Sequence, residues 1–166
     1  MDDLDRSVNL PLKIGVLSYY HKDGRTLLLL KDKPGHYMHG CYVAPGGKRL
    51  PNESLETAAI RETAEETGVV PTDPKLKGFL HFPDFGDSPF GCEWLCFVYV
   101  FEEFSGKLFE RGPEGPVVFV NVSEIVSLPM YPGDKLFTPY VFSPGLFSAK
   151  LHYSGQTLVN HVIKPF

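Results

Sequence analysis

The chain has 166 residues and a formal net charge of −4 at pH 7, which suits one compact domain. Its apolar fraction of 43% and charged fraction of 22% are ordinary for a folded domain. The sequence lacks the clustered positive charge on which duplex nucleic-acid binding depends, and it has no apolar stretch of membrane-spanning length. We therefore expect neither duplex nucleic acid nor a membrane as a partner.

The first ten residues are polar and acidic, and we expect them to form a flexible leader to a single domain that occupies residues 1–166. They lack the apolar segment of a secretory signal. The three cysteines, Cys41, Cys92 and Cys96, are odd in number and have no metal-binding spacing. We expect free, mostly buried thiols, which are typical of a reducing compartment and favour a cytoplasmic location.

Two strands are expected near the start of the domain, at residues 12–20 and 26–31. Asp23-Gly24 between them is a strong signal for a β-hairpin. The uninterrupted apolar run Leu27–Leu30 is typical of a strand covered on both faces. A loop rich in Gly and Pro follows from Pro34 to Pro51, and loops of this length commonly have a binding role.

Residues 54–67 carry the clearest helical pattern. Ser54 can cap the first turn, and Gly68 stands where a helix commonly ends. Small or apolar side chains recur at helical spacing along one stripe, at Leu55, Ala58, Ala59 and Thr63. The alanines permit a close approach of this helix to a sheet.

The rest of the chain favours strands and short helices. Strands are expected at residues 41–43, 76–82, 94–101 and 116–120, short helices at 123–128 (capped by Ser123) and 132–142, and a final hairpin at 147–153 and 157–163 turned by Ser154-Gly155. This order indicates an α+β domain with a mixed sheet packed on one main helix. The many Phe and Tyr residues after residue 77 suit either core packing or the walls of a pocket.

The helix at residues 54–67 also carries a cluster of carboxylates. At about 100° per residue, Glu62, Glu65 and Glu66 fall within a sector of about 100°. Like charges at this spacing destabilise a helix, and Arg61 is the only cation in the helix. Two explanations are open: a solvated acidic face, or a site for a divalent cation such as magnesium, which prefers oxygen ligands.

The spacing from Gly47 to Val69 resembles the signature of the Nudix family, G-x5-E-x7-R-E-U-x-E-E-x-G-U. The positions that match are Gly47, Glu53, Arg61, Glu62, Glu65, Glu66 and Gly68, with Thr63 and Val69 at the two positions that are usually aliphatic. The resemblance implies the Nudix fold, in which a mixed β-sheet packs against this helix and additional short helices complete an α/β/α sandwich. It also implies a hydrolase of nucleoside diphosphates linked to a further group.

The resemblance assigns roles within this segment, which we call the Nudix box. Its glutamates, Glu62, Glu65 and Glu66, correspond to the residues that bind Mg²⁺, or Mn²⁺ in its place, with Glu66 the foremost ligand. Arg61 corresponds to the arginine that orients Glu53 through an ion pair. The carbonyl of Gly46 is expected to complete the metal shell. Glu114 lies where the family often has a further acidic ligand or base; the alternative is a loop carboxylate with no role.

Beyond the box, the chain resembles the MutT-like branch of the family over most of residues 12–163. The features that carry this likeness are Gly46-Gly47-Lys48, Phe104-Ser105-Gly106, the run from Met130 to Asp134, and the tail from Phe147. The resemblance implies a small nucleotide substrate. It suggests hydrolysis of oxidised or ordinary purine nucleoside triphosphates, such as 8-oxo-dGTP, to the monophosphate and pyrophosphate.

The residues expected to bind this substrate are Lys48, Tyr131, Asp134 and Phe137. In vertebrate members of the branch, an aromatic residue stacks on the base and an acidic pair reads its edge. Tyr131 and Asp134 correspond to the aromatic residue and to one acid, whereas Gly133 replaces the other acid. Tyr131 suits a helix-packing role equally well. Val43 stands where such enzymes place a base-reading Asn, which implies altered or absent recognition of the 8-oxo group.

Other functions share the box. A Nudix hydrolase of an RNA 5′-triphosphate end, ADP-ribose or a dinucleoside polyphosphate is one alternative, and a nucleotide sensor without catalysis is another. Both Glu65 and Glu66 are present, which favours an enzyme over a sensor. A monomer and a homodimer are both compatible with the sequence.

Overall fold

The computed structural model describes residues 11–166, so the expected leader at residues 1–10 lies outside the described residues. The elements in chain order are β1 (Leu12–Tyr20), β2 (Arg25–Leu30), β3 (Tyr42–Val43), β4 (Gly46–Lys48), α1 (Leu55–Thr67), β5 (Val69–Thr72), β6 (Lys75–Phe82), β7 (Glu93–Phe101), β8 (Glu103–Gly106), β9 (Arg111–Gly112), β10 (Gly115–Asn121), the 3₁₀ helix η2 (Val122–Ser127), α2 (Pro132–Val141), β11 (Phe147–Ser154) and β12 (Thr157–Pro165).

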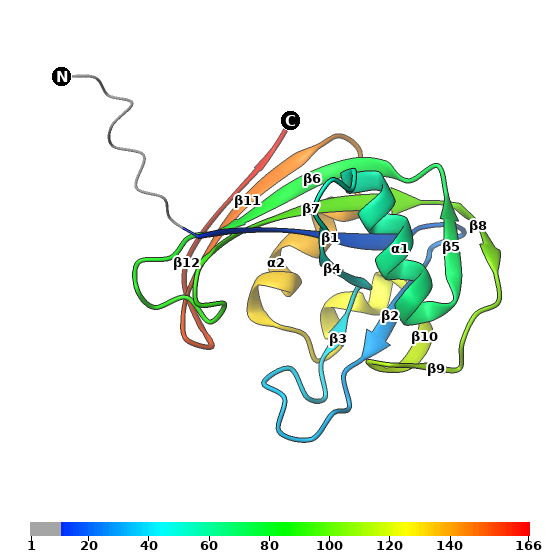
Figure 1. The fold of residues 1–166 in the computed structure, drawn as a ribbon, viewed down its shortest axis with the longest axis horizontal. Coiled ribbons are helices and arrows are strands. Elements are labelled where there is room, and N and C mark those ends of the chain that lie inside the picture. The colour runs from blue at the N-terminus through cyan, green and yellow to red at the C-terminus, as the bar shows by residue number, and fades with distance from the viewer. Residues whose placement is uncertain (1–10) are drawn as a thin grey trace.

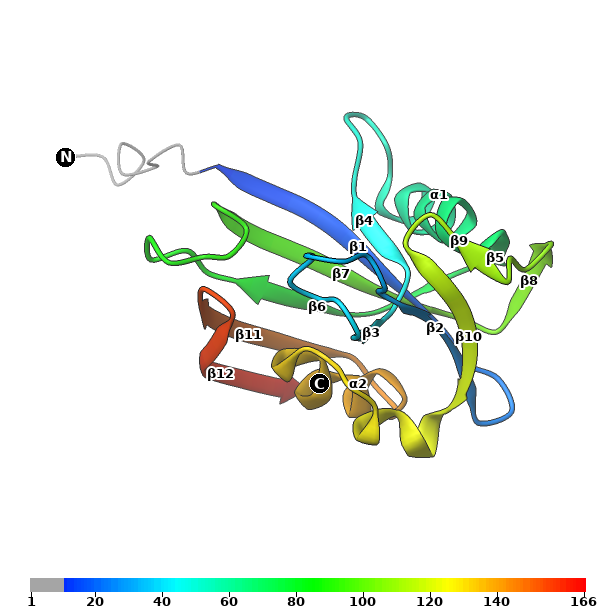
Figure 2. The ribbon, with the colours of Figure 1, turned by 90° about the horizontal axis from the view of Figure 1, so that it is seen from below.

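The largest sheet is mixed and has the strand order β12-β11-β6-β7-β1-β4. Within it β1 is parallel to β7 and β11 is parallel to β6, while the other neighbours are antiparallel. Helices α1 and α2 lie on opposite faces of this sheet (Figures 1 and 2). A four-stranded sheet, β3-β2-β10-β9, and the pair β5-β8 complete the domain. The expected α+β class and the α/β/α layering are confirmed.

The expected hairpin at the start of the domain is wrong. The chain does reverse at Asp23 and Gly24, both with positive φ, but only the isolated bridge between Lys22 and Arg25 joins the two segments. Beyond it, β1 pairs with β4 and β7, and β2 pairs with β3 and β10. The turn signal is local, whereas the choice of strand partner depends on how much apolar surface each strand buries.

Helix α1 begins and ends as its sequence predicts. The side chain of Ser54 accepts a hydrogen bond from the backbone N–H of Thr57, and Gly68 ends the helix in the left-handed conformation. The buried stripe is Ala58, Ala59, Thr63 and Thr67, which allows α1 to pack directly on β1 and β7. The Thr63 hydroxyl donates to the carbonyl of Ala59 at 2.7 Å, so its polar group is satisfied at a position that is usually aliphatic.

Two further expectations need adjustment. The segment expected as a capped helix at residues 123–128 is the 3₁₀ helix η2, which begins after Asn121 and has no side-chain cap, so Ser123 does not cap it. The C-terminal hairpin is confirmed, but Ser154 pairs with Thr157, so its turn is made by Gly155 and Gln156. The strands β4, β5, β8 and β9 were not expected, because they are short and lack a clear apolar alternation.

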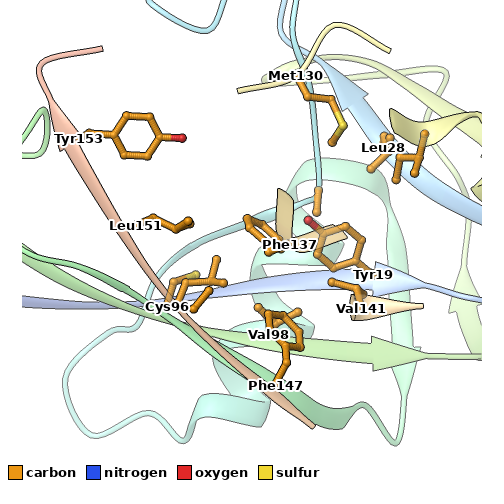
Figure 3. Packing of buried hydrophobic residues seen from close by; sticks show 14 residues of the cluster. Tyr19, Leu28, Cys96, Val98, Met130, Phe137, Val141, Phe147, Leu151 and Tyr153 are labelled. Carbon is orange, nitrogen blue, oxygen red and sulfur yellow. The ribbon is translucent and has the colours of Figure 1, made fainter. Parts of the chain in front are cut away.

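The main core lies between the large sheet and α2 (Figure 3). Its largest side chains without exposed surface come from β1, β6, α2 and β11, and they include Tyr19, Leu80, Phe137, Phe147, Leu151 and Tyr153. All three cysteines are free thiols, and Cys92 and Cys96 are buried. Within residues 11–166 no helix has both the length and the apolar character needed to cross a membrane.

Candidate active site

Strand β4 brings two glycines against the carboxylate face of α1. It pairs with β1, so that Gly46 lies opposite Leu17 and Gly47 lies opposite Val16. A Cβ atom on Gly47 would lie 2.5 Å from the carboxyl group of Glu62, and one on Gly46 would lie 2.1 Å from the carbonyl oxygen of Val16. Backbone closes position 46 to a side chain, whereas a side chain at position 47 would displace the Glu62 carboxylate, which now lies directly over the backbone of β4.

Arg61 joins three of the box glutamates. Its Nε and Nη2 donate to the two carboxylate oxygens of Glu53 at 2.7 and 3.0 Å. Its Nη1 donates to Glu62 at 2.9 Å and to Glu65 at 3.3 Å, and Nη2 also donates to the carbonyl of Lys48. The two-pronged contact lowers the pKa of Glu53 to about 2, helped by the N–H of Leu50. The expected ion pair between Arg61 and Glu53 is present.

Glu66 differs from Glu53, Glu62 and Glu65, because Arg61 donates to those three and not to Glu66 within residues 11–166. Its carboxylate accepts a hydrogen bond from the N–H of Gly46 at 3.1 Å, and no cation of residues 11–166 lies within salt-bridge distance of it. The pKa of Glu66 is raised to about 8, chiefly by burial and to a smaller extent by the charges of Glu114 and Glu62. A carboxylate in such a place is costly to ionise until a cation lies beside it.

Glu114 lies in the turn between β9 and β10 and reaches the same region. Lys31 at the end of β2 donates to it at 2.6 Å, and this contact lowers the pKa of Glu114. The charges of both Lys31 and Glu114 influence Glu66. The fold therefore brings Glu114 near the box glutamates from a point almost 50 residues away in the chain.

These carboxylates offer only oxygen donors, the set that Mg²⁺ prefers. Within residues 11–166 no three potential ligands converge into a ready-made metal site. The reason is visible in the contacts above: Arg61 holds Glu62 and Glu65, Gly46 holds Glu66, and Lys31 holds Glu114. The donor chemistry fits a divalent cation, and its binding would require some of these internal contacts to be exchanged.

A cleft of about 300 Å³ opens beside β4. Gly46, Gly47 and Lys31 line the part next to the box, while Tyr131 and Asp134 from the start of α2 line another part. Four aromatic side chains, Tyr37, Phe82, Phe90 and Trp94, contribute to the remaining wall, together with aliphatic residues such as Leu17 and Val43. No sequence motif links these residues, and for this reason the sequence did not single them out.

Among the described residues that line this cleft, Asp134 is the one carboxylate. Burial raises the pKa of Asp134 to about 7, and no hydrogen bond or positive charge of the described residues offsets that effect. Its oxygens are therefore free to bind a donor on a ligand. Tyr131 lines the same cleft, and its buried hydroxyl has no hydrogen-bond partner within residues 11–166. Val43 also lines the cleft and gives it an apolar surface there.

Two of the expected substrate residues lie elsewhere. Phe137 has no exposed surface and stacks on Phe147 in the core, so the prediction that it contacts substrate is wrong: its face of α2 points into the core. Lys48 is exposed and does not line the cleft; its side chain lines a separate hollow with Lys13 and Arg49.

Comparisons with known proteins identify the family of the chain. The family model of the NUDIX domain matches residues 10–141. An uncharacterized Nudix hydrolase, YvcI of Bacillus subtilis, is 37% identical over 112 residues, which is 68% of each chain. An ADP-ribose pyrophosphatase of Methanocaldococcus jannaschii is 33% identical over 128 residues, covering 77% of this chain and 72% of the relative.

Among solved structures, a MutT protein from Bacillus halodurans superimposes with a TM-score of 0.80 at 29% identity, covering 92% of this chain and 97% of that one. A MutT NUDIX hydrolase from Burkholderia pseudomallei has a TM-score of 0.66 at 24% identity, covering 79% and 98% of the two chains, and this likeness concerns the fold alone. The box, the sheet that carries it and these relatives lead to one assignment. The chain belongs to the Nudix family and is a Nudix hydrolase.

Proposed function

We propose that this Nudix hydrolase is a MutT-like pyrophosphohydrolase that cleaves purine nucleoside triphosphates to the monophosphate and pyrophosphate. The observation that carries the proposal is the aromatic cleft with one free carboxylate, Asp134, next to the box glycines. Aromatic walls suit a flat base. A carboxyl group can bind the amino and ring N–H groups of a purine edge.

In this proposal the base lies against Tyr131, and Asp134 binds its edge. The phosphates then extend towards Gly46 and Lys31, which line the cleft on the side of the box. Val43 offers no hydrogen bond to the base. We therefore expect 8-oxo-dGTP to be a substrate but to be favoured only weakly over dGTP.

The proposed metal ligands are Glu62, Glu65, Glu66, Glu114 and the carbonyl of Gly46. When bound, Mg²⁺ (or Mn²⁺) offsets phosphate charge and lowers the pKa of a bound water. Arg61 keeps Glu53 and Glu62 in place. Lys31 is placed to release Glu114 and to contact a phosphate instead, because it lines the cleft while its ammonium group is bonded to Glu114.

The test of catalysis is Glu66→Gln, compared with Glu56→Gln on the exposed face of the same helix. The first change should reduce Mg²⁺-dependent release of pyrophosphate by about 10³-fold or more, because the amide cannot supply a negative oxygen. The second should leave the rate nearly unchanged. Circular dichroism of both variants checks that the fold is intact. Turnover by Glu66→Gln at the wild-type rate would refute the proposed role of Glu66 as a metal ligand.

A second candidate is hydrolysis of ADP-ribose, because one of the relatives is named an ADP-ribose pyrophosphatase. A panel of purified nucleotides, assayed with Mg²⁺, separates the two. The panel contains dGTP, 8-oxo-dGTP, dATP, dCTP, ADP-ribose, a dinucleoside polyphosphate and an RNA with a 5′-triphosphate. The proposal predicts the highest kcat/KM for a purine triphosphate. Faster hydrolysis of ADP-ribose than of every triphosphate would overturn it, and binding without any hydrolysis would indicate a sensor.

A further inference from the structure

Tyr153 lies directly behind the wall of the cleft. It belongs to β11, beyond residues 10–141 that the family model matches, and it is only 2% exposed. Its ring packs between two rings that line the cleft, with centroids 5.2 Å from Tyr131 and 6.2 Å from Phe82. In Figure 3 its hydroxyl points away from its own strand. Tyr153 is therefore placed to set the position of the wall without touching a ligand.

The hydroxyl of Tyr153 ends on the first turn of α2, where it accepts a hydrogen bond from the N–H of Gly133 at 2.7 Å. The first amides of a helix have no partner within the helix. Tyr131 at the N-cap position supplies no side-chain hydrogen bond. Tyr153 thus caps α2 from a different element, one residue before Asp134.

The same contact determines which residue can stand at position 133. A Cβ atom there would lie 2.6 Å from the Tyr153 hydroxyl and 3.1 Å from Leu151. The backbone of Gly133 does not require glycine, because its φ is not positive. The hydroxyl therefore occupies the space that a side chain at position 133 would need. Tyr153 of β11 is therefore a physical reason why position 133, next to Asp134, does not carry a second acidic side chain.

We infer that Tyr153 is a positioning residue that determines base specificity. It caps α2 at Gly133 and excludes a side chain there. In this way it holds Tyr131 and Asp134 in the cleft, so that a single carboxylate binds the edge of the base. The inference rests on the proposed function, because it takes the cleft to be the base site. It adds that base discrimination depends on a residue beyond the segment that the family model matches. The phosphate chemistry at the box does not depend on Tyr153.

The first test is Tyr153→Phe, which removes one oxygen and keeps the ring. Loss of this hydrogen bond should raise KM for the preferred purine triphosphate by roughly threefold to tenfold. The preference for purine over pyrimidine triphosphates should narrow by a similar factor, while kcat changes by less than about twofold because the box is untouched. The control is Tyr99→Phe, which removes another buried hydroxyl, bonded to Glu56 on the opposite face of the sheet, and should leave both constants unchanged.

The second test uses coupling between the two positions. Gly133→Ala alone should raise KM by roughly tenfold or more, since its Cβ collides with the hydroxyl. In the Tyr153→Phe background the collision is relieved, so the added effect of Gly133→Ala should largely disappear. If Gly133→Ala alone fails to fold, the double variant should fold, and the rescue is then measured as recovery of folding. Additive effects of the two changes would overturn the inference.

A third measurement needs no substrate. The exchange of the Gly133 amide hydrogen, followed by NMR in metal-free protein, should be slow in the wild type and at least about tenfold faster in Tyr153→Phe, while amides of α1 are unchanged. Unchanged exchange would show that the cap is not formed. If the wild type hydrolyses no nucleoside triphosphate, the proposed function fails, and the exchange and the rescue of folding still decide the contact between Tyr153 and Gly133.

Discussion

At the scale of single residues, Arg61 is the cation around which the box carboxylates are arranged. One guanidinium contacts Glu53, Glu62, Glu65 and the carbonyl of Lys48. Only a planar group with several N–H donors can make these contacts together. The arrangement keeps three negative groups close to one another, and among the described residues Arg61 is the cation that forms ion pairs with them. It thereby orients the proposed metal ligands.

Arg61→Lys should therefore reduce activity while keeping the charge. A lysine can hold one of these carboxylates but not all of them, and loss of groups that orient metal ligands typically costs 10- to 100-fold. We expect a fall of about that size in kcat/KM and a higher Mg²⁺ requirement, measured by pyrophosphate release. Arg25→Lys is the matched control, since Arg25 packs over Phe119. An activity equal to that of the wild type would contradict the orienting role.

Asp134 gives a prediction about pH. Its pKa is raised from 3.8 to about 7 in the folded protein, so the folded state holds a proton that the unfolded chain releases above pH 4. Its contribution to stability is therefore present below about pH 4 and is lost as pH rises through 7. Asp134→Asn has no such proton. It should be more stable than the wild type at pH 8, by at most roughly 4 kcal/mol, and the gap should close towards pH 4.

Urea denaturation of both proteins at pH 4.5, 6 and 8 measures this difference, and comparing the two cancels the titration of all other groups. A difference that does not change with pH would show that Asp134 has an ordinary pKa. The same variant should bind purine triphosphates more weakly, because an asparagine side chain cannot carry the negative charge. Stability and binding are thus expected to change in opposite directions at position 134.

The residues of the box could be predicted from sequence because they lie within one continuous segment. Their spacing specifies a helix, its cap and its carboxylate face without knowledge of the rest of the fold. The walls of the cleft could not be predicted in this way, because Tyr37 lies in the loop before β3 whereas Phe90 and Trp94 lie in and after the loop before β7, more than 50 residues later in the chain. Phe137 shows the converse error, since an aromatic residue beside a predicted site faced the core.

At the scale of elements, α1 was predicted almost to the residue and the first hairpin was not. The helix depends on local signals, Ser54 at its start and Gly68 at its end, together with a stripe of small residues. The strands β1 and β2 share a turn but belong to different sheets. Strand pairing is decided by contacts distant in sequence, and these leave no local pattern to read.

Gly68 provides a prediction at this scale. It has φ of +75, and a Cβ on it would lie 2.1 Å from the carbonyl oxygen of Lys107. Gly24 has a similar φ of +70 but nothing within 4 Å, so it is the matched control. Gly24→Ala should cost about 1 kcal/mol for its conformation. Gly68→Ala should cost at least about 1 to 3 kcal/mol more, because its neighbour is backbone.

Chemical denaturation of the two variants measures both costs. Equal losses in the free energy of unfolding would mean that the segment after β8 moves away from the added methyl group at little cost. Glycine would then be needed at position 68 only for the left-handed backbone conformation. The larger loss expected for Gly68→Ala would instead show that the end of the box helix is held against residues 107–109. That contact lies next to Thr67, one residue after Glu66.

At the scale of the whole molecule, the domain extends beyond the part that the family model matches. That match ends at residue 141, yet β11 lies inside the large sheet, between β12 and β6, and pairs in parallel with β6. Its inward side chains Phe147, Leu151 and Tyr153 are almost fully buried in the main core. Strand β12 covers the outer edge of β11 and is largely exposed.

Two truncations should therefore behave differently. Removal of residues 157–166 takes away an edge strand with few buried side chains, and the protein should still unfold cooperatively at a lower Tm. Removal of residues 147–166 also deletes three large core side chains, each worth about 2 to 5 kcal/mol on truncation, which together are comparable to the whole stability of a typical domain. We expect that chain to show no cooperative thermal transition and no dispersed amide NMR spectrum. A folded and active 1–146 chain would mean that the segment matched by the family model is sufficient, and that β11 only adds to a domain already complete.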